Sequence, residues 1–150
     1  MFEAGPYLKI ACFCERALQE KDGILSLIRV IERVTHTRSG PDAPEEMPPF
    51  PYAMTAVVML ISGQARGRHE LRIEPEEPSG LTKPPFTATV HLEGDDKGQN
   101  IVMNMRMTFD QEGLWWFNVY FDDQMLTRMP FRVMYQRMLQ AQSPQRPPMA

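Results

Sequence analysis

Two cysteines near the start of the chain are the first side chains that could do covalent chemistry. Cys12 and Cys14 are separated by one residue, and Glu15 and Arg16 follow them. A nucleophilic cysteine needs a base that accepts its proton and an electropositive surrounding that stabilises the thiolate. The sequence contains three histidines, and nothing in it places any of them beside a cysteine: His36, His69 and His91. Because unpaired cysteines are often buried, we predict structural thiols, at least one of them on the core side of its strand. A hydrolase that uses Cys14 is the third hypothesis.

Paired aspartates in two predicted turns are the second group that could do chemistry. They are Asp95 with Asp96, and Asp122 with Asp123. In a run of antiparallel strands these turns emerge at the same end of a sheet, and clustered carboxylates are what Ca²⁺ binds. Aspartate is also a common turn residue for backbone reasons, so we predict no tight metal site and no cofactor. The cysteines and histidines match no zinc spacing. A calcium-binding or small-molecule-binding domain is the second hypothesis.

The segment Leu114–Phe121 is the richest in aromatic residues. As a strand it would turn its stronger apolar set to one face, which we predict to be the core face: Trp115, Phe117, Val119 and Phe121. The other face would carry Trp116 and Tyr120 beside Asn118. Because Trp and Tyr are frequent anchors of protein contacts, we predict that Trp116 and Tyr120 mark a binding surface for a protein partner or a second copy.

The lack of catalytic and cofactor motifs and the net charge argue against several classes of function. The sequence has no nucleophile elbow, phosphate loop or dinucleotide fingerprint, so we predict a non-enzymatic protein-binding or assembly module. Its net charge is −3, with 16 basic and 19 acidic residues, whereas nucleic-acid modules need a basic face. No apolar run approaches the roughly 18 residues of a membrane span, and the start of the chain lacks signal-peptide features. We therefore expect a cytoplasmic protein without nucleic-acid or membrane partners.

Alternating apolar and polar residues predict an all-β fold. We expect an antiparallel β-sandwich of about eight strands with turn signals between them, and at most one short helix near Cys14–Glu20. The segment Ile24–Thr37 is predicted as one long strand, although Leu27, Ile31 and Val34 also fit helical spacing and Ile24–Val34 stays open between the two. We assign residues 1–139 to a single domain and residues 140–150 to a disordered tail.

Three stretches carry a resemblance to a known family: ACFCERALQEKDGILSLIRVIERV, GQARGRHELRIEPEEPSG and QEGLWWFNVYFDDQMLTRMPFRV. With them the chain resembles an uncharacterised bacterial family of small β-sandwich proteins over most of residues 7–135. The resemblance implies an immunoglobulin-like or C2-like sandwich. It implies no activity, because no chemistry is assigned to such proteins.

Overall fold

The computed structural model describes residues 4–138, and these residues form nine strands and no helix. The strands are β1 (Tyr7–Gln19), β2 (Leu25–Ile31), β3 (Arg33–Ser39), β4 (Phe50–Gly63), β5 (Gly67–Glu76), β6 (Phe86–Leu92), β7 (Asp95–Phe109), β8 (Gly113–Phe121) and β9 (Gln124–Met138). The all-β prediction is confirmed. The predicted tail, residues 140–150, lies outside the described residues. Within residues 4–138, no helix is long and apolar enough to cross a membrane.

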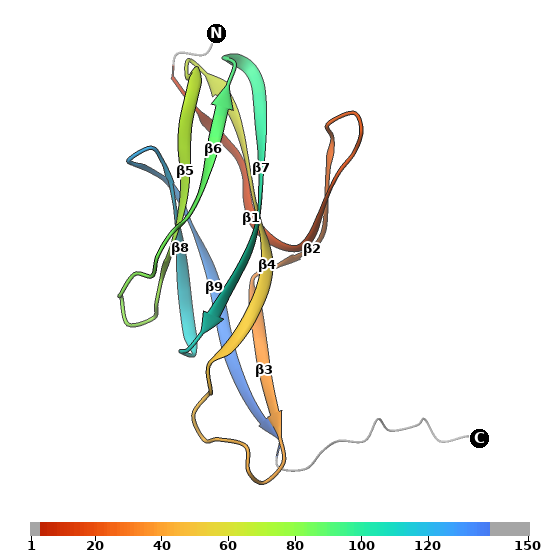
Figure 1. The fold of residues 1–150 in the computed structure, drawn as a ribbon, viewed down its shortest axis with the longest axis vertical. Coiled ribbons are helices and arrows are strands. Elements are labelled where there is room, and N and C mark those ends of the chain that lie inside the picture. Colours follow the sequence, from red (N-terminus) through yellow and green to blue (C-terminus); the bar gives the residue numbers. More distant parts are fainter. Residues whose placement is uncertain (1–3, 139–150) are drawn as a thin grey trace, which may run out of the picture.

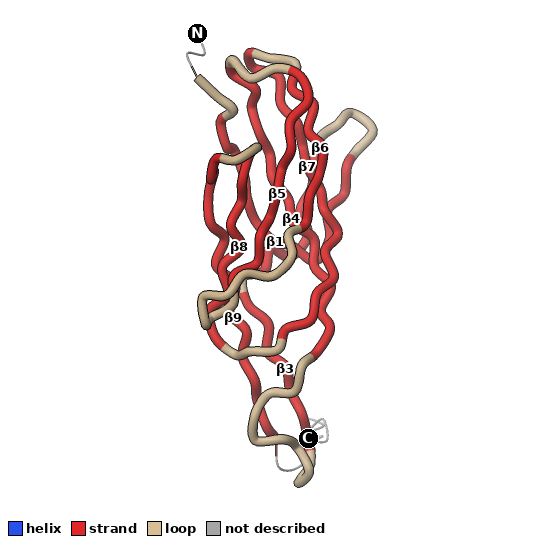
Figure 2. Tube along the Cα trace, turned by 60° about the vertical axis from the view of Figure 1, so that its left-hand side comes forward, coloured by secondary structure: helices blue, strands red, loops and turns tan. Residues whose placement is uncertain are grey.

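The strands form two sheets whose strands run roughly along the long axis of an elongated molecule (Figures 1 and 2). The four-stranded sheet has the order β2-β1-β4-β7, and the five-stranded sheet has the order β3-β9-β8-β5-β6. Residues of both sheets contribute to one hydrophobic core. The expectation of purely antiparallel pairing is wrong, because β3 runs parallel to β9.

The segment predicted as one strand, Ile24–Thr37, divides between the two sheets at Glu32. β2 pairs with β1, whereas β3 pairs with β9 on the other side of the core. At the corner, the backbone N–H of Arg132 donates to the carbonyl of Glu32 at 2.9 Å. Apolar and polar residues alternate in the same way before and after such a corner. The alternation in the sequence therefore cannot show where a chain passes from one sheet to the other. The helical alternative for this segment is wrong.

Near Cys14–Glu20, where at most one short helix was expected, the chain forms the β1–β2 hairpin. β1 continues to Gln19, and a turn that contains Gly23 with a φ of +85° leads back into β2. We call residues 15–30 the arm, because they project from the rest of the molecule (Figure 1). The side-chain amide of Asn100 on β7 donates to the Gly23 carbonyl at 3.4 Å and ties down the tip.

The core face of β8 confirms the alternation predicted from sequence. Trp115, Phe117 and Val119 are fully buried and Phe121 is nearly so. The ring of Phe117 meets Phe13 of the four-stranded sheet edge-on, with centroids 4.8 Å apart. These contacts join the two sheets, and they fix which side chains of β8 point outward.

Candidate functional site

The outer face of the five-stranded sheet, turned away from the core, carries both residues predicted as a binding surface. Trp116 and Tyr120 are partly exposed there, with Asn118 between them on β8. The strand register sets their neighbours in rows: Trp116 lies between Glu76 and Pro130, Asn118 between Glu74 and Arg128, and Tyr120 between Arg72 and Met125. We call these nine residues the outer-face site. It has an aromatic column on β8, flanked by one column on β5 and one on β9.

Each aromatic ring of the outer-face site lies beneath an arginine. The Cζ of Arg128 is 4.3 Å from the centroid of Trp116, and the Cζ of Arg72 is 4.5 Å from that of Tyr120. At these distances a guanidinium is attracted to the ring quadrupole by about 0.5–1 kcal/mol at exposed positions. These contacts favour the observed orientations of the two rings.

Hydrogen bonds hold Arg128 in place and explain why a polar residue interrupts the aromatic strand. Its Nε donates to Oδ1 of Asn118 at 2.8 Å, and its Nη2 donates to Oε2 of Glu76 at 2.9 Å. Asn118 is only 3% exposed, so its amide would be costly to bury without this partner. Asn118 thus positions the guanidinium that covers Trp116.

Three polar groups on this face have no partner within residues 4–138. The Nε of Arg72 is buried and makes no hydrogen bond there. The side chains of Glu74 and Arg132 form no ion pair within the same range. A buried N–H group without a partner costs about 1–3 kcal/mol. The Arg72 Nε is covered by the protein, whereas the Glu74 and Arg132 side chains are partly or fully exposed.

The four aspartates of the predicted metal alternative do not form one cluster. Asp95 accepts from Arg66 at 3.3 Å, and Asp122 accepts from His69 at 2.9 Å. Arg66 and His69 are themselves joined, because His69 Nε2 meets the Arg66 carbonyl at 2.7 Å. Among residues 4–138, no group of three or more His, Cys, Asp or Glu side chains could hold a metal ion.

The His69–Asp122 pair was not predicted from sequence. Asp122 has a φ of +52°, and its Oδ1 accepts the backbone N–H of Glu70 at 3.0 Å. The hydrogen bond to Asp122 raises the pKa of His69. The pKa of Asp122 is lowered, most by the hydrogen bond from the backbone N–H of Glu70 and next by the hydrogen bond from His69. The pair joins the β8–β9 turn to the start of β5, and no local sequence signal reports a contact across that distance.

The thiols lie on the four-stranded sheet, away from the outer-face site. Cys14 is fully buried and Cys12 partly so, as predicted. The expected direction is wrong: Phe13 enters the core, so its neighbours Cys12 and Cys14 belong to the opposite face. There Cys14 lies between Thr55 and Val30. Burial raises the pKa of both thiols, which disfavours the thiolate that a nucleophile needs.

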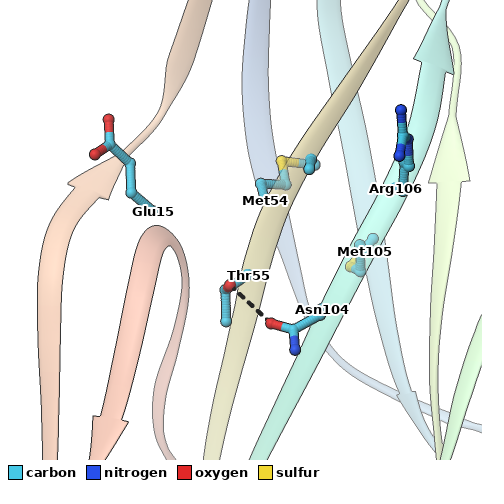
Figure 3. Close-up of a pocket in the computed structure, with 7 residues that line it drawn as sticks. Glu15, Met54, Thr55, Asn104, Met105 and Arg106 are labelled. Carbon is cyan, nitrogen blue, oxygen red and sulfur yellow. Dashed lines mark hydrogen bonds between the residues drawn. The ribbon is translucent and has the colours of Figure 1, made fainter.

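A shallow hollow of about 290 Å³ lies on the four-stranded sheet (Figure 3). It is lined by Glu15, Ala53, Met54, Thr55, Asn104, Met105 and Arg106. Three of its polar side chains already have partners: the Thr55 hydroxyl donates to Oδ1 of Asn104 at 3.1 Å, and Glu15 pairs with Arg29 at 2.9 Å. Figure 3 shows the Glu15 carboxylate turned away from Thr55 and Asn104. The hollow is at the small end for ligand sites, which span roughly 300–1,000 Å³.

A second polar cluster, also missed from sequence, surrounds the buried carboxylate of Glu77. Lys83 Nζ lies 3.1 Å from it, Ser79 donates at 2.9 Å and Gln111 donates at 2.7 Å. These hydrogen bonds, led by that of Lys83, lower the pKa of Glu77. The cluster connects the β5–β6 loop to the β7–β8 turn, because Gln111 and Asp110 of the turn contact Glu77 and Lys83 of the loop.

Comparisons with known proteins agree with the resemblance noted in the sequence. A search of curated proteins found no match. Among solved structures, the chain is similar to an immunoglobulin-like protein from Pseudomonas aeruginosa, with 14% identity, coverage of 87% of this chain and 98% of the other, and a TM-score of 0.39. The sequence profile of a family described as a family of unknown function, DUF6941, matches residues 9–134. The chain therefore belongs to DUF6941.

Proposed function

We propose that this protein is a non-enzymatic protein-binding module, and that its contact surface is the outer-face site. One observation carries the proposal: Trp116 and Tyr120 are partly exposed in one column of β8, and each is held beneath an arginine. The few residues that dominate the binding energy of protein interfaces are enriched in Trp, Tyr and Arg. The site combines all three.

The geometry lowers the cost of binding. A side chain that is immobilised on association costs about 0.5–1.5 kcal/mol, and the stacked rings and the hydrogen-bonded Arg128 are already ordered. Met125 and Pro130 are exposed beside them on β9. Aromatic residues, Met and Arg are the types enriched in protein interfaces. The exposed side chain of Arg132, which forms no ion pair within residues 4–138, gives the face a positive charge for a partner.

The other two hypotheses have less support. A hydrolase would need a reactive Cys14, but that side chain is fully buried and its pKa is raised. Calcium would have to displace Arg66 and His69 from Asp95 and Asp122. The two cysteines are unpaired, which is typical of a reducing compartment, and we propose that the module acts in the cytoplasm without a cofactor.

Site-specific photocrosslinking in cells tests the proposal. A photoreactive phenylalanine analogue replaces Met125, which is 49% exposed at the outer-face site, or Val102, which is 37% exposed on the four-stranded sheet. We expect a crosslinked protein from position 125 and none from position 102. Trp116→Ala should remove that crosslink, whereas Ile24→Ala, an apolar truncation on the exposed arm, should leave it. Equal crosslinking from both positions, or a crosslink that survives Trp116→Ala, would contradict the proposal.

A further inference from the structure

We propose that the open edge of β3 binds an acidic, extended segment of a partner protein as an added strand. The contact lies beside the outer-face site, and it goes beyond the proposed function because it uses backbone groups and a different set of side chains. Two features of β3 carry the proposal: its unused backbone groups and two rows of opposed arginines.

The backbone of β3 is used on one side. β3 is the last strand of the five-stranded sheet, beside β9 (Figure 1), and within residues 4–138 it pairs with β9 alone. At its two ends, the carbonyl of Glu32 and the N–H of Gly40 both bond to β9. Successive residues of a strand direct their backbone groups to alternate sides, so the intervening odd-numbered residues, including Thr35 and Thr37, direct theirs away from β9. Those groups have no hydrogen-bond partner within the same range.

The open edge is also regular. β3 and β9 keep one register along the whole of β3, and no residue of β3 has a positive φ. β2, an edge of the other sheet, is by contrast interrupted by Arg29 with a φ of +55°. A peptide can form backbone hydrogen bonds along a regular edge, whereas a nucleic acid or a lipid headgroup would use the charged side chains alone. The free backbone groups therefore favour a protein segment as the ligand.

Two rows of the β3–β9 pair place arginine beside arginine. Arg33 pairs with Arg132, and Arg38 pairs with Arg137. All four side chains are exposed, and like charges on neighbouring strands repel each other. Arg33 forms an ion pair with the adjacent Glu32 at 3.1 Å, whereas the other three arginines form none in the part of the chain that the structure describes. The two rows therefore favour an acidic ligand.

The acidic residues nearest in sequence do not supply these counter-charges. The loop that follows β3 contains Asp42, Glu45 and Glu46, and none of them forms an ion pair among the described residues. The segment that follows β9, residues 139–150, contains no Asp or Glu. An acidic segment of another protein would supply both the counter-charges and the backbone partners.

The spacing of the two rows predicts the sequence that binds. Val34 packs toward the core, so Arg33 points to the outer face of the sheet and Arg38, five residues later, points to the opposite face. In an added strand of either direction, the positions beside these two arginines are also five residues apart. The ligand should therefore carry Asp or Glu at two positions five residues apart.

Selection from a random peptide library against the full chain tests this expectation. The enriched peptides should share two acidic residues at that spacing. Arg38→Glu should weaken the binding of such a peptide at least about tenfold in fluorescence anisotropy, because it places like charges opposite each other. Arg106→Glu is the matched control: it reverses an exposed arginine on β7 that forms no ion pair within residues 4–138, and it should leave the affinity unchanged.

Hydrogen exchange measured by NMR distinguishes an added strand from attraction between charges. Binding of the selected peptide should slow exchange of the Thr35 and Thr37 amides, which point to the open edge. Thr37→Pro should weaken binding because it removes a donor from that edge, whereas Thr37→Ala keeps the N–H and should bind like the unmodified chain. Thermal midpoints show that both variants remain folded.

The proposal is overturned if no peptide is enriched, if the enriched peptides lack acidic residues at the expected spacing, or if binding survives Arg38→Glu. It is also overturned if the peptide binds through the arginines but leaves the Thr35 and Thr37 amides unprotected, because phosphate groups could use such a surface equally well. Trp116→Ala should leave the affinity for the peptide unchanged, so this edge and the outer-face site are tested separately.

Discussion

Removing the imidazole of His69 should change how stability depends on pH. Both of its ring nitrogens meet acceptors: Nδ1 meets the Asp122 carboxylate at 2.9 Å, and Nε2 meets the Arg66 carbonyl at 2.7 Å. A neutral imidazole has one N–H, so only the imidazolium can donate both hydrogen bonds. Consistent with this geometry, the pKa of His69 is raised above its ordinary 6.5.

The directions of the two pKa shifts determine in which pH range the His69–Asp122 pair stabilises the fold. Because the folded-state pKa of His69 is raised, its stabilisation is complete below pH 6.5 and is lost as the pH rises through the folded value. Asp122 acts oppositely: its pKa is lowered from 3.8, so its stabilisation is present above that value and is lost as the pH falls through the folded value. The pair therefore contributes most between these two ordinary values.

The size of the stabilisation by the His69–Asp122 pair depends on how exposed the two side chains are to solvent. A hydrogen bond to a charged group contributes about 1.5–3 kcal/mol when it is shielded from water. The side chain of His69 is 22% exposed and that of Asp122 is 50% exposed, so solvent screening reduces the contribution. We expect about 1 kcal/mol.

Urea unfolding at pH 5.5 and pH 8.5 measures this contribution. The unmodified chain should lose about 1 kcal/mol more between the two pH values than His69→Gln does. His91→Gln, at an exposed position on β6, is the control and should follow the unmodified chain. If His69→Gln shows the same pH dependence as the unmodified chain, the imidazolium does not contribute and the argument from paired acceptors is refuted.

Three further predictions concern the core, the thiols and the loop cluster. Phe117→Ala should cost about 3–5 kcal/mol in denaturant unfolding, and Trp116→Ala should cost less because its ring is partly exposed; equal losses would mean that both faces of β8 act as core. Cys14 should react with a maleimide only on unfolding, so rapid labelling of the native chain would contradict its burial. Glu77→Gln should speed amide exchange in the β5–β6 loop. In the unmodified chain the same loosening should begin as the pH falls through the lowered pKa of Glu77, and unchanged exchange in both cases would refute its role.

Local alternation predicted the core face of β8, whereas the continuous apolar run of β1 did not show that Phe13, and not Cys12 and Cys14, faces the core. In β8, the residues assigned to the core from sequence are the ones that pack there, and Trp116 and Tyr120 point outward as predicted. This succeeds because side chains alternate strictly with backbone position and the burial of one face determines the register.

Contacts between distant segments could not be predicted in this way. The division of Ile24–Thr37 at Glu32 depends on β9 lying ready to pair with β3, almost a hundred residues further along the chain. The arrangement of the outer-face site has the same origin. Its aromatic column was visible in the sequence, but Arg72 and Arg128 come to lie over the rings only through the pairing of β5 and β9 with β8.

The structure also offers an apolar edge that could compete with the outer-face site for partners. Ile24, Ile28 and Val30 on the arm are 63%, 40% and 64% exposed, and β2 is an edge strand. An open edge invites strand addition, and chains commonly counter it with bulges and charges. Here Arg29 interrupts β2 with a φ of +55° and forms an ion pair with Glu15 at 2.9 Å. This irregular, charged residue in the middle of the edge disfavours strand addition there, whereas β8 and its neighbours keep one register from Gly113 to Val119. The contact proposed for the outer-face site uses a sheet face and does not depend on an open strand edge.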